Sequence, residues 1–154
     1  MKKSTKVTLL VATILVISLC GGLWSMLSNA QKVLTRARTE AKTEGNEILV
    51  LLAGSWDYSA VQLRLSPEFD DKYSEDEARK QFGQWKQTYG DLASGEMKIV
   101  SFEAGGKSLG EPVLVAKLAC EATFDKGKAD VKMTLMRRPK NDWQMSDFEV
   151  GPLK

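Results

Sequence analysis

The chain has 154 residues, with 22 Lys and Arg against 20 Asp and Glu, and it contains no histidine. The absence of histidine excludes Ser-His-Asp triads, His-based zinc sites and histidine general bases. Lys2, Lys3 and Lys6 are the only charges among the first 30 residues, so the chain that follows is nearly neutral and lacks the basic excess that binds nucleic acid. We therefore expect no nucleic acid among the partners.

An uncharged, mostly apolar run covers residues 7–27. As a helix rising about 1.5 Å per residue it would span about 30 Å, the thickness of a bilayer core. Three interpretations are open: a retained anchor in the lipid bilayer, a signal peptide cleaved after Ala30, or a lipoprotein signal lipidated at Cys20. The lysines before the run favour a cytoplasmic tail over residues 1–6, a single pass through an inner membrane and a periplasmic C-terminal domain.

Helical spacing of apolar residues begins after Gln31. These residues recur every three or four positions, with Gly45 in the gap: Leu34, Ala37, Ala41, Ile48 and Leu52. The first half of this helical segment is polar, which predicts a helical stalk over residues 28–45. The second half is apolar enough to dock on a folded domain over residues 46–154, and Gly54 is expected to end the helix.

Two more helices are expected before the strands. Asp57 can cap a short helix over residues 58–65, which stops before the following Ser-Pro pair. Ser74 and Glu77 have the spacing of a capping box, which predicts a helix that runs to about Tyr89.

After Gly95 the apolar period changes to two, which is typical of strands. The pattern predicts four strands joined by turns, over residues 97–104, 112–124, 129–138 and 143–150. Phe148 falls out of step with Trp143 and Met145, which predicts a β-bulge near Ser146 and Asp147. The expected fold class is α+β: an N-terminal transmembrane helix, then helices packed on one face of a curved antiparallel four-stranded sheet.

This order resembles the cone-shaped nuclear-transport-factor-2-like (cystatin-like) superfamily, and more closely small bacterial envelope domains of that shape. The resemblance covers about residues 38–150 and rests on these motifs: Trp56-Asp57, residues 82–85 (Phe-Gly-Gln-Trp), residues 89–92 (Tyr-Gly-Asp-Leu), residues 119–124, residues 141–145 and Phe148. It implies a cone-shaped domain. It implies little about function, because this fold hosts enzymes, binding modules and assembly proteins.

Ligand-binding members of that superfamily have a pocket between helix and sheet. The candidate lining residues here are aromatic or sulfur-containing: Trp85, Tyr89, Cys120, Met133 and Trp143. Helical spacing of such residues is also typical of a plain core, so both interpretations stay open. Cys20 and Cys120 belong to different parts of the chain, which argues against a disulfide between them.

A basic edge is expected around the third predicted strand, made of Lys126, Lys128, Lys132, Arg137, Arg138 and Lys140. Charged edges block unwanted strand pairing. The same side chains could instead form a docking surface for an acidic partner or lipid headgroups, and the candidate docking residues are Lys128, Lys132, Arg137 and Arg138.

Other motifs have ordinary structural explanations. The sequence Gly105-Gly106-Lys107-Ser108 ends like a phosphate-binding loop, but predicted strands flank it on both sides. The acidic residues between 68 and 77 lack calcium-loop spacing and suit a helix N-terminus. No metal or other cofactor is expected. Asp57 and Asp147 are the carboxylates that an acid–base enzyme of this fold could use.

Three functions therefore remain open. The first is a non-enzymatic, membrane-anchored envelope domain that acts through contacts with an envelope protein partner or with its own copies, as in secretion-system assembly factors of similar layout. The second is a periplasmic binder of a small apolar ligand in a cavity of about 300 Å³ or more. The third is an Asp/Tyr acid–base enzyme, which the lack of histidine disfavours.

Overall fold

The structure is a computed structural model that describes residues 31–108 and 111–154. The chain divides into two units, Met1–Ala37 and Arg38–Lys154. Of the first unit, only residues 31–37 are described, and they are helical. The run over residues 7–27 lies outside the described part of the chain. Within the described part, no helix combines the length and the apolar character that a membrane crossing requires.

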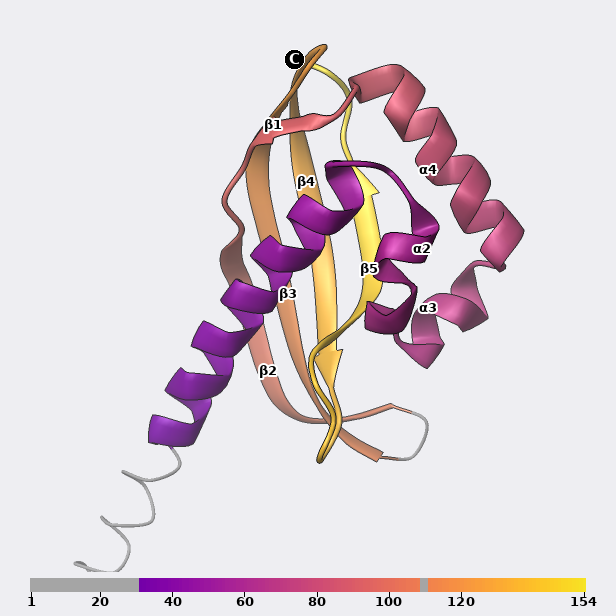
Figure 1. The fold of residues 1–154 in the computed structure, drawn as a ribbon. Helices are drawn as coiled ribbons and strands as arrows, with labels where there is room; N and C mark the ends of the chain where they lie inside the picture. The colour runs from indigo at the N-terminus through magenta and orange to yellow at the C-terminus, as the bar shows by residue number, and fades with distance from the viewer. Residues whose placement is uncertain (1–30, 109–110) are drawn as a thin grey trace, which may run out of the picture. The chain divides into compact units, whose positions relative to one another are not determined.

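The first helix covers residues 31–53, as the spacing of its apolar residues predicts. Inside the second unit this helix lies across the sheet (Figure 1), with Ile48 and Leu52 fully buried. A Cβ atom on Gly45 would lie 2.8 Å from Cδ2 of Leu118, a strand residue. The gap that Gly45 leaves in the apolar pattern is therefore a place where the helix backbone approaches the sheet closely.

The helix ends at residue 53, directly before Gly54, as predicted, but Gly54 is not the left-handed residue that follows it. Gly54 donates its amide to the Val50 carbonyl at 3.0 Å, and Trp56 donates its amide to the Leu52 carbonyl at 2.6 Å. Trp56, with φ of 56°, takes the left-handed conformation that normally belongs to glycine, and Gly54 does not. The buried Trp56 ring, 5% exposed, holds this conformation in place.

The single helix predicted next is split into α2 (Tyr58–Val61) and the 3-10 turn η1 (Gln62–Arg64). Asp57 caps α2, as predicted. A further helix, α3 (Pro67–Lys72), follows directly and was not predicted. The helical segment stops before the Ser-Pro pair, as predicted. The same pair also starts a helix, because Ser66 is the N-cap of α3 and proline suits the first position of a helix.

Helix α4 (Glu75–Tyr89) begins with the predicted capping box. The Ser74 amide donates to the Glu77 carboxylate at 2.9 Å, and the Glu77 amide donates to the Ser74 hydroxyl at 3.4 Å. Gly90 ends the helix with φ of 76°. A Cβ atom on Gly90 would also lie 2.7 Å from Cβ of Asp125, so this position requires glycine for two reasons.

The sheet is antiparallel and has five strands rather than the predicted four. They are β1 (Leu92–Ser94), β2 (Lys98–Ser108), β3 (Glu111–Phe124), β4 (Gly127–Arg137) and β5 (Gln144–Val150). β1 and β2 both pair with β3, β3 pairs with β4, and β4 pairs with β5. The additional strand β1 is short and pairs only with the end of β3.

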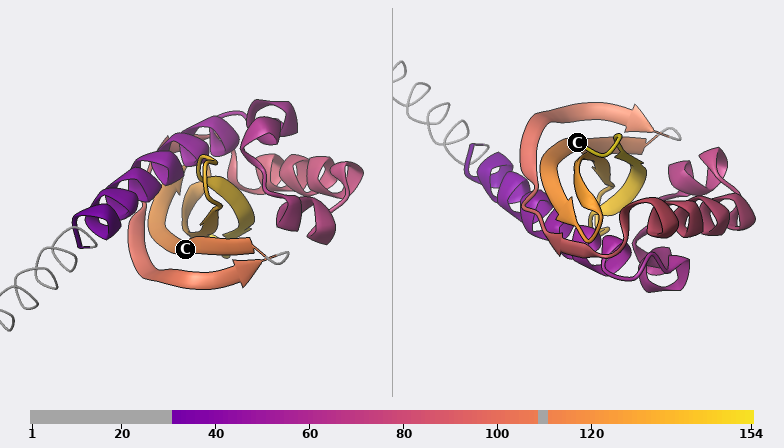
Figure 2. Two further views of the ribbon diagram at one scale, coloured as in Figure 1. Left: turned by 90° about the horizontal axis from the view of Figure 1, so that it is seen from below. Right: turned by 90° about the horizontal axis from the view of Figure 1, so that it is seen from above.

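The predicted β-bulge in β5 is confirmed. Leu135 pairs with Met145 and Thr134 pairs with Asp147, so Ser146 has no partner position on β4. The strands bend strongly along their length, and α2, α3 and α4 lie together beside β5 (Figures 1 and 2). The first helix therefore covers the sheet face, whereas the other helices flank its last strand.

Candidate functional site

An apolar groove of about 300 Å³ lies between α3, α4 and β5. Its apolar lining comes from all three elements and consists of Phe69, Tyr73, Ala78, Phe82, Trp85, Phe148 and Val150. Gln81 and Glu149 complete the lining. The groove thus offers an aromatic surface with few polar groups, which suits an apolar side chain or a small apolar molecule.

The rings of the groove hold one another in place. Trp85 meets Phe148 edge to face with ring centroids 5.6 Å apart, and it stacks on Phe82 at 5.7 Å. At the other end of the groove, the ring centroids of Phe69 and Tyr73 lie 5.1 Å apart. Such aromatic pairs add about 0.5–1.5 kcal/mol each beyond burial, so the walls of the groove are pre-formed.

A second aromatic cluster behind the groove fixes α4 to the end of the chain. Trp56 lies at its centre, 5.7 Å from Trp85 and 5.9 Å from Phe124 by ring centroid. Its indole nitrogen donates to the Gly90 carbonyl at 2.7 Å. Burial raises the pKa of the Tyr89 hydroxyl, which donates to a carbonyl just after β5.

The rim of the groove carries charged side chains. Lys72 donates to the Asp147 carboxylate at 2.7 Å and lies 5.1 Å from the Tyr73 ring centroid. The hydrogen bond to Asp147, more than any other contact, raises the pKa of Lys72 to about 12. Glu149 is exposed and makes no ion pair with any described residue, although Lys132 is opposite it on β4.

The predicted pocket residues do not line one cavity. Only Trp85 lies in the groove. Tyr89 is buried behind it, and Met133 and Cys120 lie on the sheet face covered by the first helix. Trp143 lies on another part of the domain, where it packs against Phe102 with ring centroids 6.0 Å apart. The aromatic and sulfur residues therefore serve mainly as core.

Cys120 pairs with Val131 across β3 and β4. Burial is the main cause that raises the pKa of its thiol, and the nearby Asp130 acts in the same direction. A thiol that resists ionisation is a poor nucleophile.

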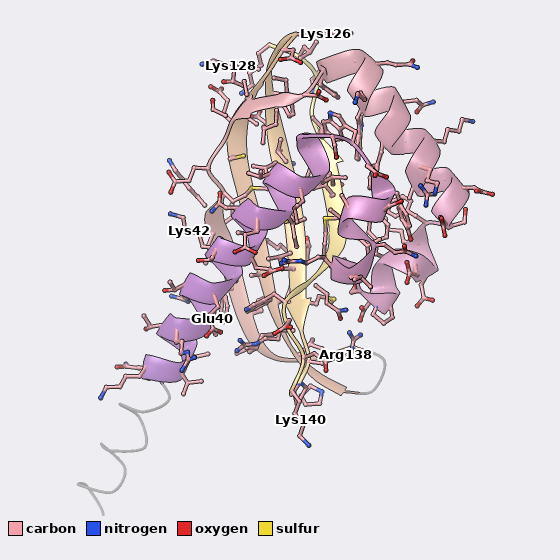
Figure 3. All side chains as sticks on the ribbon, viewed as in Figure 1. Glu40, Lys42, Lys126, Lys128, Arg138 and Lys140 are labelled. Atoms are coloured by element: carbon pink, nitrogen blue, oxygen red, sulfur yellow. The ribbon has the colours of Figure 1, made fainter. Side chains whose placement is uncertain are left out.

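The prediction that the basic residues around β4 lie on an edge of the sheet is wrong, because β4 is not an edge strand. It is hydrogen-bonded to β3 on one side and to β5 on the other. Figure 3 shows Lys128 at one end of the sheet and Arg138 at the opposite end. Lys128 and Lys132 are exposed on the sheet face away from the first helix.

The two arginines of the predicted docking residues are engaged elsewhere. Arg137 donates to the Glu40 carboxylate at 2.6 Å and lies 5.1 Å from the Trp143 ring centroid. Arg138 is buried and pairs with Glu68 of α3. Lys128, Lys132 and these two arginines therefore do not form one surface.

The remaining candidate residues have structural roles. Asp57 caps α2, and Asp147 pairs with Lys72. Gly105 and Gly106 belong to β2, which continues four residues beyond residue 104, the predicted end of that strand. No group of three or more His, Cys, Asp or Glu in the described part of the chain could hold a metal ion.

Sequence reasoning missed most of the groove. Phe69 and Tyr73 were not singled out because α3 was not predicted, although the N-cap signal of Ser66 followed by proline was present. Phe148 was expected to mark a bulge and to belong to the resemblance, but not to line a pocket. Comparison of the chain with models of protein families, with curated proteins and with solved structures finds no match.

Proposed function

We propose that this protein is a single-pass, membrane-anchored envelope domain that acts by binding another protein, and that the groove between α3, α4 and β5 is its binding site. The proposal joins the uncharged run over residues 7–27, taken as a retained anchor with a cytoplasmic tail, to a non-enzymatic periplasmic domain at a bacterial inner membrane. It includes the cone-shaped, nuclear-transport-factor-2-like arrangement that the order of helices and strands suggests.

The single observation that supports this function is the pre-formed aromatic groove. Protein interfaces depend on a few anchors, mostly aromatic, that fill well-packed pockets. Phe69, Phe82 and Phe148 are 2–3% exposed and form a rigid floor, while Tyr73 and Trp85 are partly exposed at its walls. Exposed apolar surface of this kind marks interaction sites in folded proteins.

A small apolar ligand is the second candidate for the same groove. Its volume of about 300 Å³ lies at the lower end of the range of ligand pockets, and seven of its nine lining residues have aromatic or aliphatic side chains. This function would need no partner protein. A bound small molecule would then accompany the purified protein.

The test compares two variants of the full-length tagged protein after mild crosslinking in its own cells. Gln81→Arg places a long cationic side chain in the groove, and Gln87→Arg places the same side chain on an exposed part of the same helix. We expect a reproducible envelope partner with wild type and with Gln87→Arg, and its loss with Gln81→Arg. A small molecule recovered in place of a partner supports the second candidate, and equal partner recovery from both variants contradicts the proposed function.

A further inference from the structure

The outer edge of β5 is open over a short interval. At one end of the strand, the Ser66 amide donates to the Met145 carbonyl at 2.9 Å and so covers the edge. At the other end, the Tyr89 hydroxyl donates to the Gly151 carbonyl at 2.7 Å. Between these closures, residues 147–150 pair with β4 on one side and with no described segment on the other.

This open interval forms one wall of the groove. Phe148, Glu149 and Val150 all line it, opposite α4. Every second residue of an edge strand directs its amide and carbonyl away from the sheet. Backbone donors and acceptors of β5 therefore border the same groove as the aromatic rings. A strand added here would lie about 4.8 Å from β5.

The chain itself uses this edge in the same manner just outside the groove. Leu65 forms a parallel bridge with Met145, and the Gln144 side chain donates to the Leu65 carbonyl at 3.1 Å. The chain then leaves the edge to form α3. The edge beyond Met145 is thus geometrically able to accept an extended neighbour, and none of the described segments fills that place.

We infer that the partner presents an extended segment that pairs with residues 147–150 as an added strand and inserts an apolar side chain among the rings of the groove. In this mode of recognition the backbone hydrogen bonds supply affinity and the side-chain pockets supply specificity. The inference rests on the proposed function, because it specifies the form of the partner at the same groove.

The two faces of β5 determine the side-chain pattern of that segment. Phe148 is buried on the face toward the helices, whereas Glu149 is exposed on the other face. A partner residue opposite Phe148 therefore points toward the rings. Its two neighbours point to the other face, beside Asp147 and Glu149. Lysine or arginine suits these neighbours, because a positive and a negative side chain that lie directly across from each other stabilise the pairing of two strands.

Glu149 is the carboxylate that selects these basic residues. Asp147 is already paired with Lys72 at 2.7 Å, whereas Glu149 makes no ion pair with a described residue. The segment that fits the edge and the groove together is therefore an extended one in which apolar and basic residues alternate.

The experiment selects peptides from a random displayed library on the full-length protein, held in nanodiscs of zwitterionic phosphatidylcholine. Each enriched peptide is synthesised and its affinity is measured for wild type, for Glu149→Lys and for Glu103→Lys. Glu103 is an exposed carboxylate on β2, so its reversal is a matched control for charge. Each peptide is also made in two versions with N-methyl groups on alternate residues, which block one or the other row of backbone donors.

We expect enriched peptides with alternating apolar and basic residues. Their binding should weaken about tenfold with Glu149→Lys and about twofold or less with Glu103→Lys. One N-methylated version should lose binding by at least about tenfold, and the other should keep it.

Peptides without this alternation, or equal loss from both N-methylated versions, overturn the inference and leave the proposed function standing. The same holds if no peptide is enriched while Gln81→Arg still loses its partner in cells. If Gln81→Arg also keeps its partner, the proposed function fails together with the inference.

Discussion

Gly45 of the first helix and Leu118 of β3 are so close that a Cβ atom on Gly45 would lie 2.8 Å from Cδ2 of Leu118. Leu118 is 1% exposed and cannot move aside freely. We predict that Gly45→Val lowers the free energy of unfolding by about 2 kcal/mol, because it overpacks the contact between helix and sheet. Chemical unfolding followed by tryptophan fluorescence measures the change.

Gly83, in the middle of α4, provides the matched control. A Cβ atom there would have no heavy atom within 4 Å. Gly83→Ala should raise the free energy of unfolding by about 0.5–1 kcal/mol, because alanine favours the helix more than glycine does. If Gly45→Val were as stable as wild type, the close approach of the helix to the sheet would be wrong.

Arg138 is buried next to Glu68 and joins the end of β4 to α3. We predict that Arg138→Gln lowers the free energy of unfolding by about 3 kcal/mol, because it removes the buried positive charge that pairs with the Glu68 carboxylate. Lys140→Gln, at an exposed position two residues later, should change the free energy of unfolding by about 0.5 kcal/mol or less. Equal effects of the two substitutions would contradict the role given to Arg138.

The capping box of α4 makes stability depend on pH. Hydrogen bonds from the Ser74 hydroxyl, and next from its backbone amide, hold the pKa of the Glu77 carboxyl below its ordinary value of 4.5. A lowered pKa gives stability that is present above about pH 4.5 and is lost as the pH falls through the folded-state value. Glu77→Gln should therefore unfold at a lower temperature than wild type near neutral pH, and the difference should shrink in acid.

Thermal unfolding at a series of pH values tests this. A difference in unfolding temperature that stays constant from neutral pH into acid would show that the Glu77 charge has no part in the cap. Asp76→Asn is a suitable control, because Asp76 is in the same turn but outside the capping box.

Local signals in the sequence predicted most of the elements. The capping box of Ser74 and Glu77, the N-cap Asp57 and the change of period after Gly95 each depend on neighbouring residues, so they could be recognised without the fold. The bulge at Ser146 was also predictable, because it shifts the alternation of buried residues along a single strand.

The groove and the position of β4 could not be predicted in this way. The groove unites Phe69 and Trp85 with Phe148, which are brought together only by the way α3 and α4 flank β5. The left-handed Trp56 depends on its burial among rings distant in sequence. The order of strands likewise decides which strand is an edge, and a row of basic residues does not reveal it.

The most direct test of protein binding through the groove is photocrosslinking in cells with a benzophenone amino acid at position 81 of the full-length protein. Position 81 lines the groove, and position 87 on the same helix is exposed away from it. We predict one dominant crosslinked protein from position 81 and none from position 87, with the crosslink mapped to an extended, apolar and basic segment. Crosslinks of equal yield and equal identity from the two positions, or none from position 81, would contradict the account.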